Sequence, residues 1–273
     1  MNKEFVPNEF LVNNLYRLPM AKIICIANQK GGVGKTTTAI NLSSCVSVAE
    51  KKSLIIDLDP QANSTSGLGI EIDEKQNSIY EILVNDASAK ECIVPTHVPN
   101  LDLIPSHIKL VGAEVELVHK IAREKILYEA LKELDEHYDF IFIDCPPSLS
   151  LLTLNAFAAG NSVLIPIQCE YYALEGLSQL LSTINLVQKH LNKGLKIEGV
   201  LLTMYDHRLK LSQQIAEEIK DYFRDKVYET IIYRNVRLAE APSFGKPIIM
   251  YDAISAGARN YMKLAEEVIA KNQ

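Results

Sequence analysis

Residues 30–37 read Lys-Gly-Gly-Val-Gly-Lys-Thr-Thr, between the apolar run KIICIAN at residues 22–28 and a stretch with helical spacing at residues 36–49. A glycine-rich loop between a strand and a helix is typical of a P-loop, whose backbone N–H groups and helix N-terminus bind phosphates. Lys35 places a positive charge on the β- and γ-phosphates, and the Thr36 hydroxyl suits Mg²⁺. The stretch therefore predicts an enzyme that binds ATP and Mg²⁺ and hydrolyses the ATP. The loop residues expected to contact ATP are Lys30, Gly31, Gly32, Val33, Gly34, Lys35, Thr36 and Thr37.

Apolar runs alternate with helical stretches on both sides of this loop. The runs expected to be strands are residues 22–28, 53–59, 101–106, 138–147, 161–167, 197–205 and 226–232. The stretches expected to be helices are residues 36–49, 114–136, 175–191, 211–224 and 255–270. Because continuous apolar strands that alternate with helices form parallel sheets buried on both faces, we predict an α/β fold of the P-loop NTPase class, with a mostly parallel sheet.

The chain has 273 residues, 48% of them hydrophobic, and shows no internal repeat or linker-like stretch. We therefore expect residues 20–273 to form one ATPase domain. Residues 1–19 follow no periodic pattern and are expected to be a flexible extension, or to precede a start at Met20. The longest apolar runs are far below the roughly 20 residues that cross a bilayer, and no signal-peptide core is visible, so we expect a cytoplasmic protein. Five cysteines without a C-x-x-C pair predict reduced structural thiols.

Acidic residues end two of the predicted strands. Asp57 and Asp59 lie on the same side of the chain because side chains alternate along a strand. Asp144 follows four apolar residues, as a Walker B acid does, and would hold Mg²⁺ through a water. Residues 145–148 (CPPS) form a stiff turn that can respond to the γ-phosphate. We expect Thr36, Asp57 and Asp144 to surround the metal.

These motifs resemble those of the ParA/MinD family. KGGVGKTT, with its additional Lys30, is similar to the deviant Walker A motif of that family, in which the extra lysine crosses an ATP-dependent dimer interface. DLDPQAN at residues 57–63 resembles the D-x-D-P-Q-x-N signature of ParA proteins. The similarity covers nearly all of residues 20–272 and is closest to the chromosomal ParA (Soj) group. Further segments that carry it are residues 144–156 (DCPPSLSLLTLNA), 166–180 (PIQCEYYALEGLSQL), 199–208 (GVLLTMYDHR) and 234–248 (RNVRLAEAPSFGKPI).

The resemblance implies roles for the residues and a function for the chain. Lys30, Lys35 and Asp59 would be catalytic, with Asp59 orienting the attacking water and Asp57 supporting the metal shell. The ATP-bound protein would form a face-to-face homodimer that binds double-stranded DNA without sequence specificity. A ParB-type partner would reset it by stimulating hydrolysis, in the segregation of chromosomes or plasmids at the nucleoid.

Arg208 and Arg237 match arginines that bind DNA in Soj proteins, and Met204 and Asn235 are the candidates for contacts to adenine. The net charge of −6 does not exclude a local basic face, since binding depends on where the charges lie. Two positions depart from the family pattern. They are Tyr233, where similar proteins have proline, and Ala256, where they often have arginine. Residues that could extend the basic face are Lys210, Arg234, Lys246 and Arg259.

Two other functions stay open. A MinD-like membrane-surface ATPase needs a C-terminal amphipathic helix with a basic face and a bulky apolar face. Residues 263–271 contain two acids and no aromatic residue, and so favour a helix that docks on the core. An electron-transfer ATPase needs cysteines at the dimer seam for a shared metal cluster, and Cys145 is the one cysteine in a suitable place.

Overall fold

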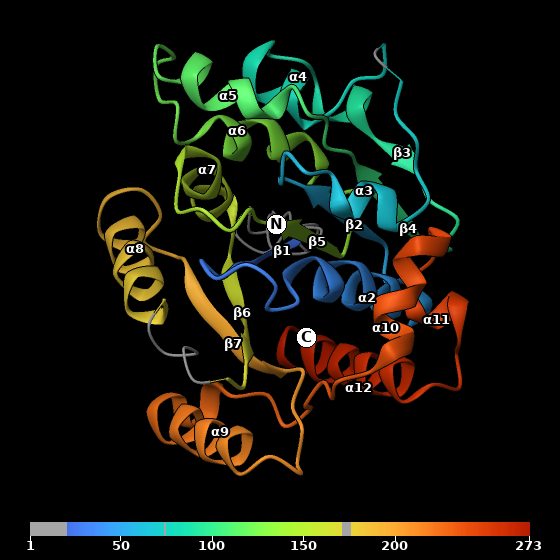
Figure 1. Cartoon of the computed structure of the whole chain (residues 1–273). Helices are drawn as coiled ribbons and strands as arrows, with labels where there is room; N and C mark the ends of the chain where they lie inside the picture. Colours follow the sequence, from blue (N-terminus) through green and yellow to red (C-terminus); the bar gives the residue numbers. More distant parts are fainter. Residues whose placement is uncertain (1–20, 74, 171–175) are drawn as a thin grey trace, which may run out of the picture.

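A seven-stranded sheet forms the centre of the molecule (Figure 1). The computed structural model describes residues 21–73, 75–170 and 176–273, so the extension expected at residues 1–19 lies outside the described part. The strand order is β3-β4-β2-β5-β1-β6-β7, and every neighbouring pair is parallel except β3 and β4. The strands are β1 (Lys22–Ile26), β2 (Ser53–Asp57), β3 (Val94–Pro95), β4 (Leu101–Ile104), β5 (Phe140–Asp144), β6 (Ser162–Gln168) and β7 (Lys196–Thr203).

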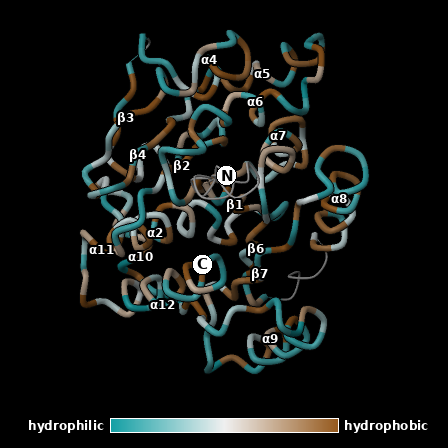
Figure 2. Tube along the Cα trace, turned by 180° about the vertical axis from the view of Figure 1, so that it is seen from behind, coloured by the Kyte–Doolittle hydropathy of each residue, from teal (hydrophilic) through white to brown (hydrophobic). Residues whose placement is uncertain are grey.

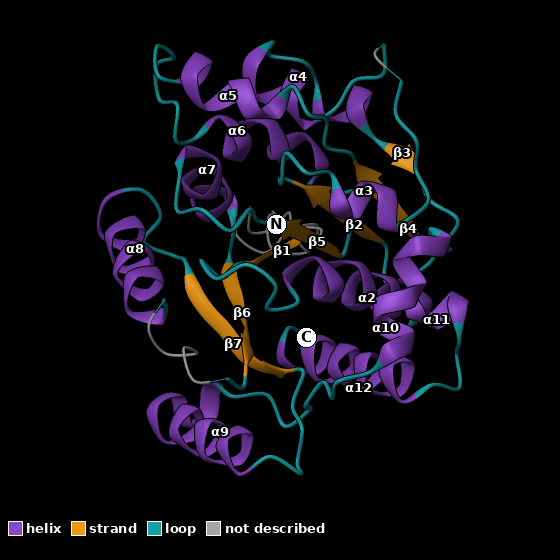
Figure 3. Ribbon diagram, in the orientation of Figure 1, coloured by secondary structure: helices purple, strands orange, loops and turns teal. Residues whose placement is uncertain are grey.

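Helices cover both faces of the sheet (Figure 3). The α-helices of the described part are α2 (Lys35–Val48), α3 (Asn63–Gly67), α4 (Ile79–Val84), α5 (Leu110–Leu117), α6 (Ile126–Leu131), α7 (Leu151–Ala159), α8 (Leu177–His190), α9 (Lys210–Phe223), α10 (Val236–Glu240), α11 (Ile248–Tyr251) and α12 (Ala256–Lys271). Its 3₁₀ helices are η1 (Ala89–Cys92), η2 (Lys132–Leu134), η3 (Arg224–Lys226) and η4 (Ala241–Phe244).

The alternation of side chains along each strand explains why there are two cores. In β1, Ile23 and Cys25 face a core built with α4 to α9, whereas Ile24 and Ile26 face a core built with α2 and α10 to α12. Each central strand is therefore apolar throughout its length, as a strand covered on both faces must be. Figure 2 shows this pattern as hydrophobic colour along the inner strands and hydrophilic colour on much of the periphery. The predicted α/β class with a mostly parallel sheet is confirmed.

One edge of the sheet gathers the chemically active positions. Because β1, β2, β5, β6 and β7 run parallel, their carboxyl ends meet at the same edge. Asp57 at the end of β2 pairs in register with Asp144 at the end of β5, and Asp144 also pairs with Ile26 at the end of β1. The predicted P-loop follows β1, so it emerges at the same edge as both acids.

The single helix predicted over residues 114–136 is wrong. Helix α5 ends at Leu117 and α6 begins at Ile126. Between them Val118 is 50% exposed and Ile121 is 97% exposed, so this stretch lacks the buried apolar stripe that would stabilise another helical turn. The Asn155 side chain of α7 binds the free backbone groups of the break, because its amide donates to the carbonyl of Arg123 and its oxygen accepts from Leu127 N–H.

The strand predicted over residues 226–232 is also wrong. The segment follows η3 and contacts β7 through an isolated bridge between Val200 and Val227 and through backbone hydrogen bonds from Tyr228 to Val200 and from Ile232 to Leu202. Between these two bonds, the N–H groups of Glu229 and Thr230 donate to the carboxylate of Glu267 in α12. A side chain from a distant helix therefore interrupts the pairing with β7.

The C-terminal helix docks on the core as expected. Helix α12 packs against α2 and buries Tyr261, Leu264 and Val268. Within the described ranges, no helix is both long enough and apolar enough to cross a membrane. The five cysteines are all buried and carry free thiols.

Candidate nucleotide-binding site

The loop between β1 and α2 has the backbone of a phosphate-binding turn. Gly32 and Gly34 adopt left-handed conformations, with φ of 73° and 88°, which side chains with a Cβ rarely adopt. Helix α2 begins directly after Gly34, so the free N–H groups of its first turn point toward the loop. The Thr203 hydroxyl donates to the carbonyl of Val33 at 2.8 Å and so ties the loop to the end of β7. The loop is thus held in place before any phosphate binds.

Lys35 lies inside the loop rather than in solvent. Lys35 is 7% exposed, and its Nζ donates to the carbonyl of Lys30 at 3.0 Å. Burial lowers the pKa of Lys35 from its usual value, while the negative charges of Asp144 and Asp59 act in the opposite direction. A phosphate at the loop would supply further negative charge to this buried ammonium group.

Asp57 uses both carboxylate oxygens within its own chain. Oδ2 accepts from the N–H and hydroxyl of Thr65, at 2.8 Å and 2.7 Å, and Oδ1 accepts from the N–H of Asp59 at 3.2 Å. Asp57 is fully buried and, like Asp144, does not line the pocket at the loop. Burial raises the pKa of Asp57 to about 6, despite these hydrogen bonds. The geometry gives Asp57 a part in shaping the loop that carries Asp59, and its place in the metal shell stays a prediction.

Asp144 has the free oxygen that a metal site requires. Its Oδ2 accepts from the Ser64 hydroxyl at 2.8 Å, whereas Oδ1 is buried and has no hydrogen-bond partner among the described residues. Burial, followed by the charge of Asp57, raises the pKa of Asp144 to about 7. The Thr36 hydroxyl is close enough to the Asp144 carboxylate to oppose this rise in its pKa. A carboxylate oxygen without a partner beside a threonine hydroxyl is a set of oxygens that Mg²⁺ or its bound water prefers. Asp144 and Thr36 therefore fit the metal expected from the sequence.

Two adjoining pockets lie along the loop. The phosphate-side pocket has a volume of about 370 Å³, and the base-side pocket has a volume of about 180 Å³. Gly34, Thr37 and Met204 line both of them, so the pockets meet at the start of α2. The phosphate-side pocket is lined by Gly31, Gly32, Gly34, Lys35, Thr36, Thr37, Asp59, Gln61, Asn63, Pro147 and Met204. A polar, glycine-rich half beside a more apolar half matches the two ends of a nucleotide.

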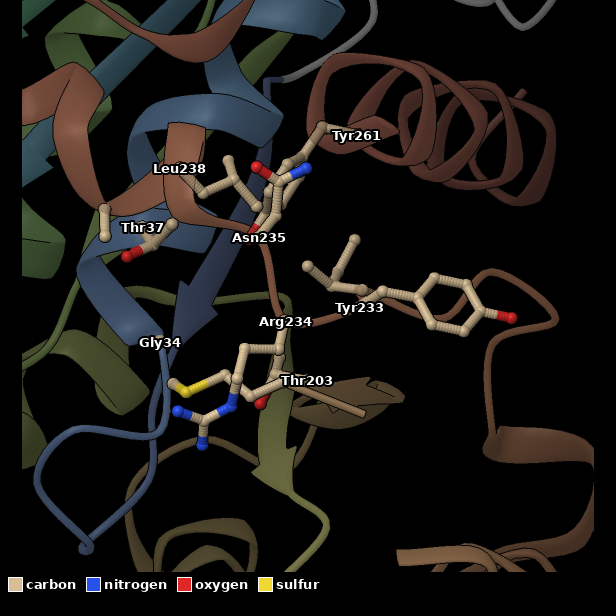
Figure 4. Close-up of a pocket in the computed structure, with 11 residues that line it drawn as sticks. Gly34, Thr37, Thr203, Tyr233, Arg234, Asn235, Leu238 and Tyr261 are labelled. Carbon is tan, nitrogen blue, oxygen red and sulfur yellow. The ribbon is translucent and has the colours of Figure 1, made fainter. Parts of the chain in front are cut away.

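The base-side pocket is lined by both predicted adenine contacts, Met204 and Asn235, and Figure 4 labels Asn235. Met204 has a left-handed backbone, with φ of 48°, at the point where β7 leaves the sheet. Asn235 caps α10, because its oxygen accepts from the N–H of Arg237 at 2.8 Å. The ring of Tyr233 points away from Gly34 in Figure 4 and packs edge-on against Tyr205, with 5.7 Å between ring centroids. Tyr233, which stands where similar proteins have proline, therefore leaves the centre of this pocket open.

Several residues that line the pockets have no local sequence signal. Tyr261 comes from α12, more than 200 positions after the loop, and its hydroxyl lies 3.2 Å from that of Thr38 in α2. Leu238 and Ile232 reach the base-side pocket through the packing of the C-terminal segments. The sequence motifs that contain Asp59 and Asp144 could have predicted three further lining residues, namely Gln61, Asn63 and Pro147.

Lys30, the additional lysine of the loop, turns toward a carboxylate of its own chain. Its Nζ lies 3.9 Å from Oε2 of Glu170, which follows β6. The other oxygen of Glu170 lies 3.6 Å from Nη2 of Arg234. The Lys30 side chain is 34% exposed, so it can leave this weak ion pair for another partner.

The two predicted DNA-binding arginines lie on different elements. Arg208 is 77% exposed in the turn between β7 and α9, and Arg237 is 55% exposed in α10. The segments that lead to them are joined by a backbone hydrogen bond, because the Arg234 N–H donates to the carbonyl of Tyr205 at 3.2 Å. The four residues expected to extend the basic face, Lys210, Arg234, Lys246 and Arg259, are all exposed.

Comparisons with known proteins show which families and structures this chain is similar to. The AAA domain family model matches residues 21–197. The sporulation initiation inhibitor protein Soj of Bacillus subtilis is 61% identical over 251 residues, which cover 92% of this chain and 99% of the relative. A solved structure of cobyrinic acid a,c-diamide synthase from Mycobacterium smegmatis with bound ADP and magnesium is 35% identical, with a TM-score of 0.80 and coverage of 92% and 94%. A putative plasmid partition protein of Borrelia burgdorferi bound to AMPPNP is 30% identical, with a TM-score of 0.77 and coverage of 93% and 100%.

Proposed function

The chain belongs to the Soj/ParA family, and from that premise we propose that it is an ATP-hydrolysing switch that partitions DNA. The observation that carries the proposal is the convergence of Lys35, Thr36 and Asp144 at one edge of the sheet, with a carboxylate oxygen free for a metal. The Borrelia relative bound to an ATP analogue and the Mycobacterium relative with ADP and magnesium support ATP and Mg²⁺ as the ligands.

In the proposed reaction, Lys35 and the N–H groups of the loop hold the β- and γ-phosphates. Thr36 and Asp144 would hold Mg²⁺, with Asp57 supporting that shell. When bound, Mg²⁺ neutralises charge on the phosphate oxygens. Asp59 lines the pocket, and its Oδ1 accepts from Gln61 N–H at 3.0 Å, so Oδ2 can orient the attacking water. Met204 and Asn235 would contact the adenine.

The switch requires a second copy of the chain. We propose that ATP joins two subunits face to face, and that Lys30 leaves Glu170 to reach the γ-phosphate bound by the partner subunit. The dimer would double the basic surface that contains Arg208 and Arg237, and so strengthen binding to the phosphates of any DNA duplex. A ParB-type protein would stimulate hydrolysis and return the subunits to the weakly binding state.

A MinD-like membrane function is not favoured. Helix α12 packs on α2 along its apolar side, with Tyr261, Leu264 and Val268 buried. Membrane binding through a C-terminal helix needs an apolar face that is free to enter the lipid.

DNA binding with ATP and with ADP, at several salt concentrations, tests the proposal. We expect the ATP form to retard a DNA duplex of any sequence, the ADP form to bind much less, and the affinity to fall steeply with salt because counterion release dominates backbone contacts. Equal affinity with the two nucleotides would leave an ATPase without the proposed switch.

A further inference from the structure

The turn after β7 contains a closed ion pair. The Asp206 carboxylate accepts from Nη2 of Arg208 at 2.6 Å, from Nε at 2.9 Å and from the backbone N–H of Arg208 at 3.0 Å. Two of these three bonds occupy the Nε–Nη2 edge of the guanidinium, which is an edge that would otherwise bind a phosphate in bidentate fashion. The arginine expected to bind DNA is therefore already bound to a carboxylate of its own chain.

The two partners of this pair differ in freedom. The Asp206 side chain is 13% exposed, whereas that of Arg208 is 77% exposed. The N–H of Asp206 donates to the Ser212 hydroxyl of α9 at 3.3 Å, which fixes the backbone of Asp206. The backbone N–H of Arg208 donates to Oδ1 of Asp206, which fixes the carboxylate. Asp206 is thus the fixed partner, and Arg208 is the partner that can move away into solvent.

Arg237, the second expected DNA contact, also has acidic neighbours, but they are two separate carboxylates and not one bidentate partner. Its Nη1 lies 3.1 Å from Glu240, and its Nε lies 3.7 Å from Asp252. By contrast, no ion pair within 4.0 Å is found for the exposed residues Lys210 and Lys246 in the described part of the chain. Among the described residues of the expected basic face, Arg208, Arg234 and Arg237 therefore have an acidic neighbour, and the pair at Arg208 has the shortest contact, at 2.6 Å.

We infer that Asp206 masks Arg208 and thereby limits the affinity of the chain for DNA. The inference rests on the proposed function. A DNA phosphate and the Asp206 carboxylate compete for the same edge of the guanidinium, and a neutralised arginine releases no counterion from DNA. Because an exposed ion pair is weak, closely spaced phosphates can open it, but each opening opposes binding. A single subunit then binds DNA poorly, and two subunits acting together overcome the mask.

The test is Asp206→Asn in the full chain, with duplex binding measured with ATP over a series of salt concentrations. Asparagine keeps an oxygen for the Arg208 N–H and loses the charge. We expect affinity to rise about threefold to tenfold at low salt. Binding should also become more sensitive to salt. In a plot of the logarithm of the DNA-binding constant against the logarithm of the salt concentration, the slope should become steeper by about 0.9 for each additional phosphate contact. The gain should vanish in the double variant Asp206→Asn with Arg208→Gln.

A matched control separates masking from a general change in charge. Asp225→Asn removes the same charge at the far end of α9, from an exposed residue of η3, and should leave both affinity and salt slope nearly unchanged. Asp206→Ser provides a second neutral variant if the asparagine variant does not fold. ATP binding should be unaffected in every variant, because Asp206 lines neither pocket.

Weaker DNA binding by Asp206→Asn would overturn the inference and would mean that the carboxylate holds Arg208 in a binding geometry. Equal gains from Asp206→Asn and Asp225→Asn would also overturn it, because net charge alone would then explain the effect. If the wild type binds DNA only with ATP and Asp206→Asn behaves like the wild type, the proposed function stands and the mask does not. If neither protein binds DNA with ATP, the proposed function and the inferred mask are both wrong.

Discussion

Asp57 and Asp144 are register partners on adjacent parallel strands, and both side chains are almost fully buried. Residues paired in this way project to the same face of the sheet, so two carboxylates lie next to each other. Burial raises the pKa of Asp57 to about 6, with a smaller contribution from the charge of Asp59. Burial and the charge of Asp57 raise the pKa of Asp144 to about 7. The edge of the sheet therefore holds buried negative charge at a cost in stability, which the nearby ammonium group of Lys35 offsets in part.

The first prediction concerns stability and pH without metal or nucleotide. Both carboxyls have folded pKa values above the ordinary value of 3.8, so the folded state binds their protons more tightly than the unfolded state. This contribution is fully present below about pH 3.8 and is lost as pH rises through about 6 and 7. Urea denaturation at pH 5 and pH 8 should show that Asp144→Asn loses less stability over this interval than the wild type. Parallel pH profiles for the two proteins would contradict it.

The second prediction concerns Lys35, whose ammonium lies within the loop. Lys35→Ala should weaken ATP binding by about tenfold to 100-fold, because the phosphates lose their nearest point charge. Titration with a fluorescent ATP analogue measures the effect. Lys52→Ala, at an exposed residue before β2, is the control and should bind as the wild type does. Near-normal affinity in Lys35→Ala would refute the assigned role.

The sequence was sufficient to place candidate site residues at one edge of the sheet wherever a local motif stands at a strand end. Lys35 and Thr36 follow β1, and Asp59 and Asp144 follow or end neighbouring strands, so a parallel sheet brings them together without further information. The alternation of apolar strands and helices was likewise enough for the α/β class, because both faces of such a sheet must be covered.

The sequence was insufficient where distant segments decide the outcome. Glu267 accepts from Glu229 and Thr230 and so interrupts the pairing of residues 226–232 with β7, and Asn155 stabilises the break in the helix predicted at residues 114–136. Tyr261 enters the base-side pocket only because α12 packs on α2. Propensity and periodicity describe neighbours along the chain, and these contacts join residues far apart in it.

The third prediction concerns Gly199 of β7, which lies against the ring of Tyr228. A Cβ at Gly199 would lie 2.5 Å from Cε2 of Tyr228, whose side chain is fully buried. Gly199→Ala should therefore lower the free energy of unfolding by about 1–3 kcal/mol, through overpacking. Urea denaturation measures this change. Gly194→Ala, where the nearest atom is 3.5 Å away, should have a much smaller effect, and equal losses in the two variants would contradict the packing argument.

The fourth prediction separates binding from hydrolysis at Asp59. Asp59→Ala should retain ATP, because Lys35 and the loop remain, but release phosphate about 100-fold more slowly or worse, since the water loses the group that orients it. The ATP-bound dimer should then accumulate. Phosphate release and gel filtration with ATP test the two halves. A variant that binds ATP but elutes only as a monomer would show that the water-orienting role or the face-to-face dimer is wrong.

The fifth prediction concerns Arg237, whose guanidinium is shared between Glu240 and Asp252. Arg237→Glu replaces a cation that DNA can capture with a third acid in the same cluster, so repulsion is added to the loss of a phosphate contact. DNA binding with ATP should weaken by more than about tenfold, and the salt dependence should become shallower.

A charge reversal elsewhere distinguishes this effect from the change in net charge. Lys193→Glu alters an exposed residue before β7, at the amino edge of the sheet, opposite the P-loop. It should weaken DNA binding far less than Arg237→Glu, because it lies away from the expected contact surface. Both variants should bind ATP as the wild type does, since neither residue lines a nucleotide pocket. If the two reversals weaken DNA binding equally, Arg237 is a solvated surface charge, and the contact surface lies elsewhere on the dimer.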